Sequence, residues 1–394
     1  MQPYLFQADR VHELERAITV VAGLDEPDPI RRGAKARALF DAEVAIAATT
    51  QLELRERART KFGDRAATMF FTPAGLEQAT RVELAEHRAS RFAATGSSSV
   101  LDLCCGIGSD LAAFSRAGLR AHGVERDELT AVIARHNAPE ATVAVDAAET
   151  ADWRAAGGVF IDPARRGTSG RTFDPRAFSP SLGFVAELLE SKEFAAAKLA
   201  PGIQHQLIPP NVEAEWVSFD GGVKETVLWS TGFSAAIRRR ATVMTSRSDG
   251  HVAQLTDRDR EDETVGSLGA FLYEPDGAVI RAGLVTQVVA LLRGGRRLDP
   301  QIAYLASDEA VDLPFARGYR VIEQFPYSVK RLRDELRRRA VGIVEIKKRG
   351  VDIDPASLRR ELRLSGDEAI TVILIRIGHS HQAVLAERMT QPSL

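Results

Sequence analysis

The stretch LDLCCGIGSD, from Leu101 to Asp110, runs from an apolar segment through two glycines into polar residues that favour the start of a helix. A strand, a glycine loop and a helix in this order are typical of α/β folds that bind a nucleotide-like ligand at the loop. The dinucleotide fingerprint GxGxxG requires a third glycine, but here Asp110 stands near its place. The loop therefore raises the question of which ligand it binds.

The residues around this stretch alternate between predicted strands and predicted helices. Helices are expected at 109–119 and 127–138. Such alternation indicates a parallel sheet with helices on both faces. Two further strands within 214–230 are joined by an Asp-Gly-Gly turn, so we expect the sheet to end in an antiparallel pair. The other strands are predicted at 98–105, 120–126, 141–149, 157–166 and 195–202.

Composition along the chain divides it into four regions. The first region is rich in helix formers, and Thr72-Pro73 gives a hydroxyl N-cap and a first-turn proline for one helix that continues to Phe92. The stretch 245–267 is polar and charged, which predicts a linker or a surface loop. We expect a helical N-terminal region at 1–95, an α/β core at 96–244, a linker and connecting α+β segment at 245–318 and a last α+β domain at 319–394.

Bulk composition excludes several classes of protein. A chain of 394 residues is too long for one hydrophobic core, so we expect more than one domain. Its two cysteines, Cys104 and Cys105, are adjacent, which favours neither a disulfide nor a metal site, and we expect no metal. Residues 1–20 are charged throughout, and no apolar run reaches the ~20 residues of a membrane span. We therefore expect a cytoplasmic protein with no membrane partner.

The charge pattern of the glycine loop favours S-adenosylmethionine over a dinucleotide. Asp110 at the helix start would repel a pyrophosphate, whereas S-adenosylmethionine carries a cationic sulfonium and no phosphate. Asp102, four residues before Gly106, can receive the ammonium group of such a ligand, and Gly106 and Gly108 let the backbone approach it. Binding of NAD or NADP is the remote alternative.

Carboxylates at the ends of the next two strands point to the same ligand. Glu125 ends the second strand, where it can accept hydrogen bonds from both ribose hydroxyls, and Asp146 ends the third, where it can accept one from the adenine amine. A single Asp at a strand end more often caps a helix or forms a turn, but the ordered set predicts a cofactor site. That site comprises Asp102, Cys104, Gly106, Gly108, Glu125, Arg126, Asp146, Ala147 and Asp162.

The motif series LDLCCGIG, VER, VDAAE and DPAR resembles that of class I S-adenosylmethionine-dependent methyltransferases over about residues 70–240. The resemblance implies a Rossmann-like seven-stranded core with a reversed seventh strand. It also implies that Asp162 and Pro163 lie beside the transferred methyl group, because enzymes that methylate amino nitrogens carry (Asp/Asn)-Pro-Pro-aromatic there. In that motif the acidic or amide oxygen and the proline carbonyl accept hydrogen bonds from the target NH, which orients the nitrogen.

The sequence departs from that motif, because Ala164 and Arg165 replace the second proline and the aromatic residue. Arginine can stack on a base or bind phosphate, so Arg165 and Arg166 are predicted substrate contacts, with a solvated loop as the alternative. Both cysteines belong to the cofactor loop, so we expect direct transfer to nitrogen or oxygen rather than a covalent cysteine intermediate. Lys198, within the predicted fifth strand, is expected to be a partly buried structural lysine.

Positive charge is concentrated between residues 329 and 349. Nine basic residues and three acidic ones give this segment an excess of +6 in a chain of net charge -2. Such a segment can neutralise RNA phosphates, and the alternative is a solvated helix face with pairs such as Arg331 with Glu335. The predicted RNA contacts are Lys330, Arg331, Arg337, Lys347 and Lys348.

Three further segments resemble a bacterial family of methyltransferases that end in a THUMP-like domain. They are GLEQATRVELAEHRASRF at 75–92, FLYEPDGAVIRAGL at 271–284 and YLASDE at 304–309. The resemblance implies that the C-terminal domain captures structured RNA, namely tRNA or rRNA, because THUMP domains bind RNA. THUMP domains commonly precede the catalytic domain, whereas this one follows it.

These features predict a methyltransferase that transfers a methyl group to a base nitrogen of structured RNA. Two alternatives stay open. The same chemistry could act on a protein or a small molecule, and it would then not depend on the C-terminal basic residues. The chain could also be a non-catalytic module that binds S-adenosylmethionine and RNA, which the unusual DPAR motif favours.

Overall fold

The computed structural model describes residues 3–6, 10–165, 178–246 and 251–389. It divides into two compact units, one formed by Met1–Glu213 with Val227–Ala235 and the other by Ala214–Thr226 with Ala236–Leu394. The division passes through the hairpin of strands β8 (Glu213–Phe219) and β9 (Gly222–Trp229).

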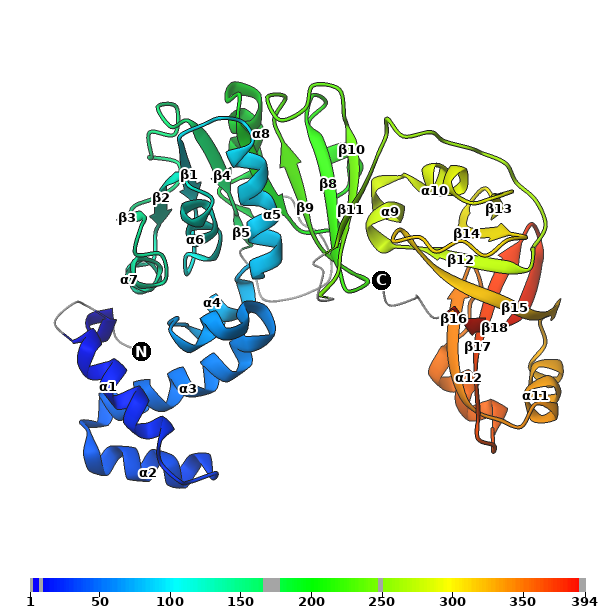
Figure 1. Ribbon diagram of the computed structural model, residues 1–394, viewed down its shortest axis with the longest axis horizontal. Coiled ribbons are helices and arrows are strands. Elements are labelled where there is room, and N and C mark those ends of the chain that lie inside the picture. Colours follow the sequence, from blue (N-terminus) through cyan, green and yellow to red (C-terminus); the bar gives the residue numbers. More distant parts are fainter. Residues whose placement is uncertain (1–2, 7–9, 166–177, 247–250, 390–394) are drawn as a thin grey trace. The chain divides into compact units, whose positions relative to one another are not determined.

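The N-terminal region of the first unit is helical, as predicted. Its apolar faces form a hydrophobic core that also includes Ile107 of the glycine loop and Ile133 of helix α7 (Glu128–Asn137). Helix α5 (Val82–Ala93) lies beside α6 (Ser109–Arg116), which follows the glycine loop (Figure 1). The helices of this region are α1 (Val11–Ala22), α2 (Pro29–Leu39), α3 (Ala42–Phe62), α4 (Pro73–Gln78) and α5 (Val82–Ala93).

The single helix predicted from Thr72 to Phe92 is broken, and that prediction was wrong in this respect. Thr72 does cap a helix, because its hydroxyl accepts a hydrogen bond from the Gly75 amide at 2.9 Å. The helix ends after two turns because a lysine from α3 takes over its last carbonyl groups, which a continuing helix would otherwise bind. The Lys61 ammonium donates to the carbonyls of Leu76 and Glu77 at 2.8 Å and of Ala79 at 3.0 Å.

The large sheet has the strand order β3-β2-β1-β4-β7-β9-β8-β10-β11. Strands β1, β2, β3, β4 and β7 are parallel, so their carboxyl ends meet at one edge, where open α/β sheets bind ligands. This arrangement confirms the predicted Rossmann-like core. Its elements are β1 (Ser99–Leu103), α6 (Ser109–Arg116), β2 (Arg120–Glu125), α7 (Glu128–Asn137), β3 (Thr142–Val145), β4 (Gly158–Ile161), α8 (Leu182–Ser191) and β7 (Ala195–Leu199), with a separate two-stranded sheet of β5 (Ala164–Arg165) and β6 (Phe178–Ser179).

The sheet continues beyond the antiparallel hairpin at which we expected it to end. Strand β10 (Arg239–Met244) pairs parallel with β8, and β11 (Val252–Thr256) pairs antiparallel with β10. Strand β11 lies inside the stretch predicted to be a linker or loop. The prediction was wrong for the five residues of β11, because pairing with β10 makes them an edge strand with Leu255 buried, although the residues around them are polar and charged. An edge strand needs only such a partial apolar face.

The second unit contains a seven-stranded sheet in the order β13-β14-β12-β15-β18-β17-β16. Two hydrophobic cores cover this sheet, and one of them includes Leu332 and Leu336 of α11 and Leu358 and Leu362 of α12. The elements are β12 (Phe271–Pro275), α9 (Gly277–Ala282), α10 (Val285–Leu291), β13 (Arg296–Asp299), β14 (Ile302–Ser307), β15 (Ala316–Pro326), α11 (Val329–Arg338), β16 (Val341–Arg349), α12 (Pro355–Leu362), β17 (Glu368–Ile377) and β18 (Ser380–Arg388).

Candidate functional site

The glycine loop turns sharply between β1 and α6. Cys104, Gly106 and Gly108 have φ values of 64°, 55° and 85°, a region that glycine tolerates and other residues rarely adopt. A Cβ atom on Gly106 would meet nothing within 4 Å, so this side of the loop faces open space. A Cβ atom on Gly108 would lie 3.2 Å from the Ala134 carbonyl oxygen. Gly106 therefore leaves room for a ligand, whereas Gly108 allows the loop to pack against α7.

Asp102 at the end of β1 is a buried carboxylate without a hydrogen-bond partner among the described residues. Its exposed fraction is 0%, and neither carboxylate oxygen is bonded. Burial, followed by the nearby Asp110 and Asp162 carboxylates, raises the pKa of Asp102 well above its ordinary value. A buried polar group without a partner is costly, so this carboxylate is suited to a cationic ligand.

Asp110, whose negative charge we expected to face the ligand, is instead paired with a cation inside the protein. The Arg88 guanidinium of α5 forms a buried ion pair with the Asp110 carboxylate, and it also lies 4.6 Å from the centre of the Phe160 ring. The negative charge that we expected to repel a pyrophosphate is therefore compensated inside the protein. The electrostatic argument for a cationic ligand instead rests on Asp102, which has no hydrogen-bond partner in the described part of the chain.

Two further predicted cofactor residues are fixed by backbone amides. The Glu125 carboxylate accepts hydrogen bonds from the Gly106 amide at 3.0 Å and from the Asp127 amide at 2.9 Å, which joins the end of β2 to the glycine loop. The Asp146 carboxylate accepts hydrogen bonds from the Ala147 amide at 2.7 Å and from the Thr150 hydroxyl at 2.8 Å. The Thr150 hydroxyl and then the Ala147 amide lower the pKa of Asp146. Asp146 thus has the turn-forming role that we weighed as the alternative for an Asp at a strand end.

Asp162 follows β4 and forms an ion pair with Lys198 of β7. Burial raises the pKa of Asp162, and the Lys198 ammonium opposes that rise. Lys198 also donates a hydrogen bond to the Thr80 hydroxyl at 2.9 Å. Sequence reasoning missed this contact, because Thr80 and Lys198 lie far apart in the chain and the expected helix concealed the break that holds Thr80. We name Asp102, Asp110, Asp162, Arg88 and Lys198 the strand-tip cluster.

One side chain ties the N-terminal region to the glycine loop. The Asn137 amide donates to the carbonyls of Phe70 and Ile107, both at 2.9 Å, and its oxygen accepts from the Phe70 amide at 2.8 Å. On the same side, a Cβ atom on Gly75 would lie 2.5 Å from a methyl carbon of Ile107. The N-terminal helices therefore form one wall beside the loop.

Comparison with known proteins identifies the family. Two relatives from Mycobacterium tuberculosis, strains CDC 1551 and H37Rv, are S-adenosylmethionine-dependent methyltransferases that have not been characterised further. Each is 36% identical over 356 residues, which covers 86% of this chain and 95% of the relative. The chain belongs to this family of S-adenosylmethionine-dependent methyltransferases.

Further comparisons extend the assignment to the fold and to the C-terminal domain. A crystal structure of a Porphyromonas gingivalis W83 protein assigned as a methyltransferase superposes with a TM-score of 0.76 at 22% identity. It covers 96% of this chain and 99% of its own. A family model described as THUMP domain-like matches residues 316–388 of the methyltransferase. These residues run from β15 to β18, and β12 and β14 extend the same sheet beyond the match.

The cofactor of this methyltransferase is S-adenosylmethionine, and the residues at the carboxyl edge of the sheet fit it. Asp102 is a buried carboxyl group that lacks a partner among the described residues, and Gly106 leaves open space on one side of the glycine loop. Cys104 is half-buried, and burial followed by the Glu125 carboxylate raises the pKa of its thiol. A protonated thiol at this place is a poor nucleophile, in agreement with the expected direct transfer. Arg126 is exposed.

The predicted RNA contacts are less uniform than the sequence indicated. Lys330, Arg331 and Arg337 are exposed on α11, and Arg331 lies 4.7 Å from the centre of the Phe325 ring. Lys347 is only 16% exposed and forms an ion pair with Glu274 at 2.7 Å. The Lys348 ammonium donates a hydrogen bond to the Ile353 carbonyl. For Arg165 only the backbone is described, in β5, and Arg166 lies outside the described residues.

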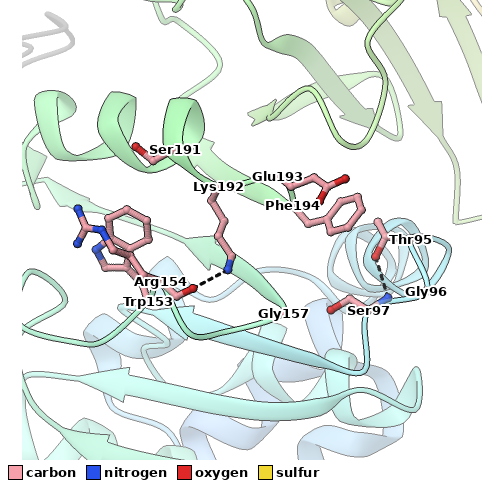
Figure 2. Close-up of a pocket in the computed structure, with 10 residues that line it drawn as sticks. All are labelled: Thr95, Gly96, Ser97, Trp153, Arg154, Gly157, Ser191, Lys192, Glu193 and Phe194. Carbon is pink, nitrogen blue, oxygen red and sulfur yellow. Dashed lines mark hydrogen bonds between the residues drawn. The ribbon is translucent and has the colours of Figure 1, made fainter.

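A cavity of about 520 Å³ lies elsewhere on the sheet, and Figure 2 shows its lining. Ser97, Gly157 and Phe194, which precede β1, β4 and β7, contribute to it, so it opens at the amino ends of these strands. Its Lys192 ammonium donates to the Arg154 carbonyl at 2.9 Å. The cavity is therefore at the opposite edge from the strand-tip cluster and is not the cofactor site.

Among the residues that the structure describes, none of the helices has the length and the apolar character of a membrane span. No group of three or more His, Cys, Asp and Glu side chains there is arranged to hold a metal ion.

Proposed function

We propose that the methyltransferase transfers a methyl group to a base nitrogen of structured RNA, tRNA or rRNA, at the carboxyl edge of its large sheet. The observation that carries the proposal is Asp102, near Asp162 and without a hydrogen-bond partner in the described part of the chain, together with a C-terminal domain that is THUMP-like. S-adenosylmethionine, when bound, supplies a methyl group that is activated by its attachment to a positively charged sulfur.

In this proposal Asp102 binds the ammonium group of the cofactor, and Gly106 leaves room for its amino-acid part. Glu125 and Asp146 bind the ribose and the adenine. The neighbouring Cys104, Gly108, Arg126, Ala147 and Asp162 complete the site. The proposal is supported by the convergence of these residues on the ends of three adjacent parallel strands.

For the acceptor, we infer that Asp162 and the carbonyl of Pro163 accept hydrogen bonds from the target NH group. This orients the nitrogen lone pair toward the methyl group, and such positioning accounts for much of the rate of a bimolecular transfer. The exposed Lys330, Arg331 and Arg337 on α11 supply contacts to RNA phosphates.

The test uses purified full-length protein, radiolabelled S-adenosylmethionine and total RNA from a strain in which the gene is deleted. We expect label in RNA, and we expect at least a 100-fold loss of label with Asp162→Ala. Lys192→Met, at the opposite edge of the sheet, is the control and should leave the rate unchanged. Labelling of protein or small molecules in place of RNA would contradict the substrate, and full activity of Asp162→Ala would contradict the role of Asp162.

A further inference from the structure

The register of β4 and β7 places Asp162 and Lys198 opposite each other. These strands pair in parallel, with Ile161 next to Ala197. Asp162 directly follows Ile161 at the end of β4, and Lys198 directly follows Ala197 within β7. The two side chains meet in an ion pair in which Lys198 is 15% exposed and Asp162 is 32% exposed. The lysine is therefore the deeper member of the pair, and the carboxylate is the member nearer to solvent.

Lys198 is also held from the other side, by the N-terminal region. Thr80 is 6% exposed and accepts a hydrogen bond from the Lys198 ammonium at 2.9 Å. Thr80 lies in the break between α4 and α5, directly after Ala79, whose carbonyl is bound by Lys61. The break in the helix thus has a consequence for the site, because it brings the Thr80 hydroxyl to Lys198.

We propose that Lys198 is a positioning residue for methyl transfer, which keeps the Asp162 carboxylate ionised and fixed toward the acceptor while Thr80 fixes Lys198. This inference rests on the proposed role of Asp162. During transfer the acceptor nitrogen bonds to the methyl carbon as the carbon–sulfur bond breaks and its electron pair stays on sulfur. The nitrogen then loses its proton to water. An ionised Asp162 stabilises the positive charge that develops on the nitrogen.

The surroundings of Asp162 explain why it needs a cation. Burial and the Asp110 carboxylate both raise the pKa of Asp162, while Lys198 and Arg88 lower it. Arg88 is already engaged by Asp110 in a buried ion pair, so among the side chains that the structure describes Lys198 is the cation in direct contact with Asp162. The charged or titratable groups that act on Asp162 or are acted on by it are Lys198, Asp110, Arg88, Asp102 and Cys104.

The test compares Lys198→Met with Lys198→Arg in the methylation assay. We expect kcat of Lys198→Met to fall about 100-fold, with a smaller change in KM for RNA. We expect the acid limb of its kcat profile to move up by about 1 to 3 pH units, because an adjacent cation lowers a carboxyl pKa by that amount. Lys198→Arg should restore part of the rate and the position of the limb. An unchanged pH profile in Lys198→Met would overturn the proposal.

A second measurement needs no acceptor and covers the case in which Lys198→Met is unstable. The protonated-carboxyl infrared band that is lost in Asp162→Asn reports the titration of Asp162. Its midpoint should rise in Lys198→Met and, by less, in Thr80→Val, with Thr80→Ser close to the wild type. Unmoved midpoints would overturn the role of Lys198. Full methylation by Asp162→Ala with moved midpoints would instead contradict the proposed function, so the two failures are distinguishable.

Discussion

The strand-tip cluster and the basic segment 329–349 are both rich in charged side chains, but the two regions differ in how far these side chains are buried and paired. In the cluster the groups are few and mostly buried, and Asp102 has no hydrogen-bond partner among the described residues. In the basic segment the groups are many and mostly exposed, and several arginines are paired with acids from other elements. An excess of charge in the sequence therefore does not measure the charge available to a ligand.

The reason for the difference is the source of the partners. The acids that neutralise the basic segment come partly from outside it, since Glu323 lies on β15, Glu361 on α12 and Glu274 on β12. In the strand-tip cluster, three carboxylates share the two cations Arg88 and Lys198. When all three carboxylates are ionised, one negative charge is left over there, and a bound cofactor with one net positive charge would balance it.

The largest expected effect is a loss of stability when the buried ion pair between Arg88 and Asp110 is removed from the strand-tip cluster. Arg88→Met leaves Asp110 buried without its guanidinium, and we expect the free energy of unfolding to fall by about 3–5 kcal/mol. Chemical denaturation of the protein without ligand measures this. Its matched control is Arg320→Met in the second unit, where the Arg320 and Glu387 side chains are 56% and 52% exposed. That variant should lose at most about 1 kcal/mol, and equal losses would contradict the distinction.

The next effect concerns the unbalanced charge. We expect Asp102→Asn to weaken S-adenosylmethionine binding about 10- to 100-fold, because a hydrogen bond to a charged group contributes about 1.5–3 kcal/mol. Isothermal calorimetry measures the affinity. Unchanged affinity would remove Asp102 from the cofactor site.

Asp102 also predicts a pH dependence of stability. A buried acid whose pKa is raised in the folded state stabilises the fold below its ordinary pKa of about 3.9. That contribution is lost as the pH rises through the raised pKa. Asp102→Asn cannot ionise, so this variant does not lose that stability as the pH rises. The Tm of the ligand-free variant minus the Tm of the ligand-free wild type should therefore be larger at pH 8 than at pH 5. A constant difference in Tm would show that Asp102 ionises normally.

The smallest expected effect concerns RNA binding by the basic segment, where exposed cations can be compared with paired ones. Lys330→Gln with Arg337→Gln removes two exposed cations from α11, for which no ion pair is observed among the described residues. We expect weaker binding of bulk tRNA and a slope of log affinity against log salt that is shallower by about 1 to 2. Arg338→Gln is the control, because Glu335 and Glu323 already pair with Arg338. A larger loss of tRNA binding in Arg338→Gln than in the double variant would contradict the assignment of Lys330 and Arg337 as the RNA contacts.

The sequence predicts the strands and the glycine loop at the carboxyl edge of the sheet well, and it predicts the polar contacts there poorly. The strand, the glycine loop and the acidic strand ends are local patterns, so LDLCCGIG and VER suffice to predict them. The partners Arg88, Thr80 and Lys198 come from distant parts of the chain, and no local pattern indicates that they meet. Strand β11 was missed for a related reason, since its pairing with β10 and not its composition makes it a strand.

The Asn137 amide limits how the methyltransferase can be shortened. Three of its hydrogen bonds join Phe70 and Ile107, and the core around them includes Phe62 and Phe71. A truncation that began at β1 would remove these aromatic neighbours from the glycine loop and expose apolar residues such as Ile133 to solvent. A minimal catalytic fragment must therefore retain the N-terminal helices, and any expression design that treats them as a dispensable leader should yield insoluble protein.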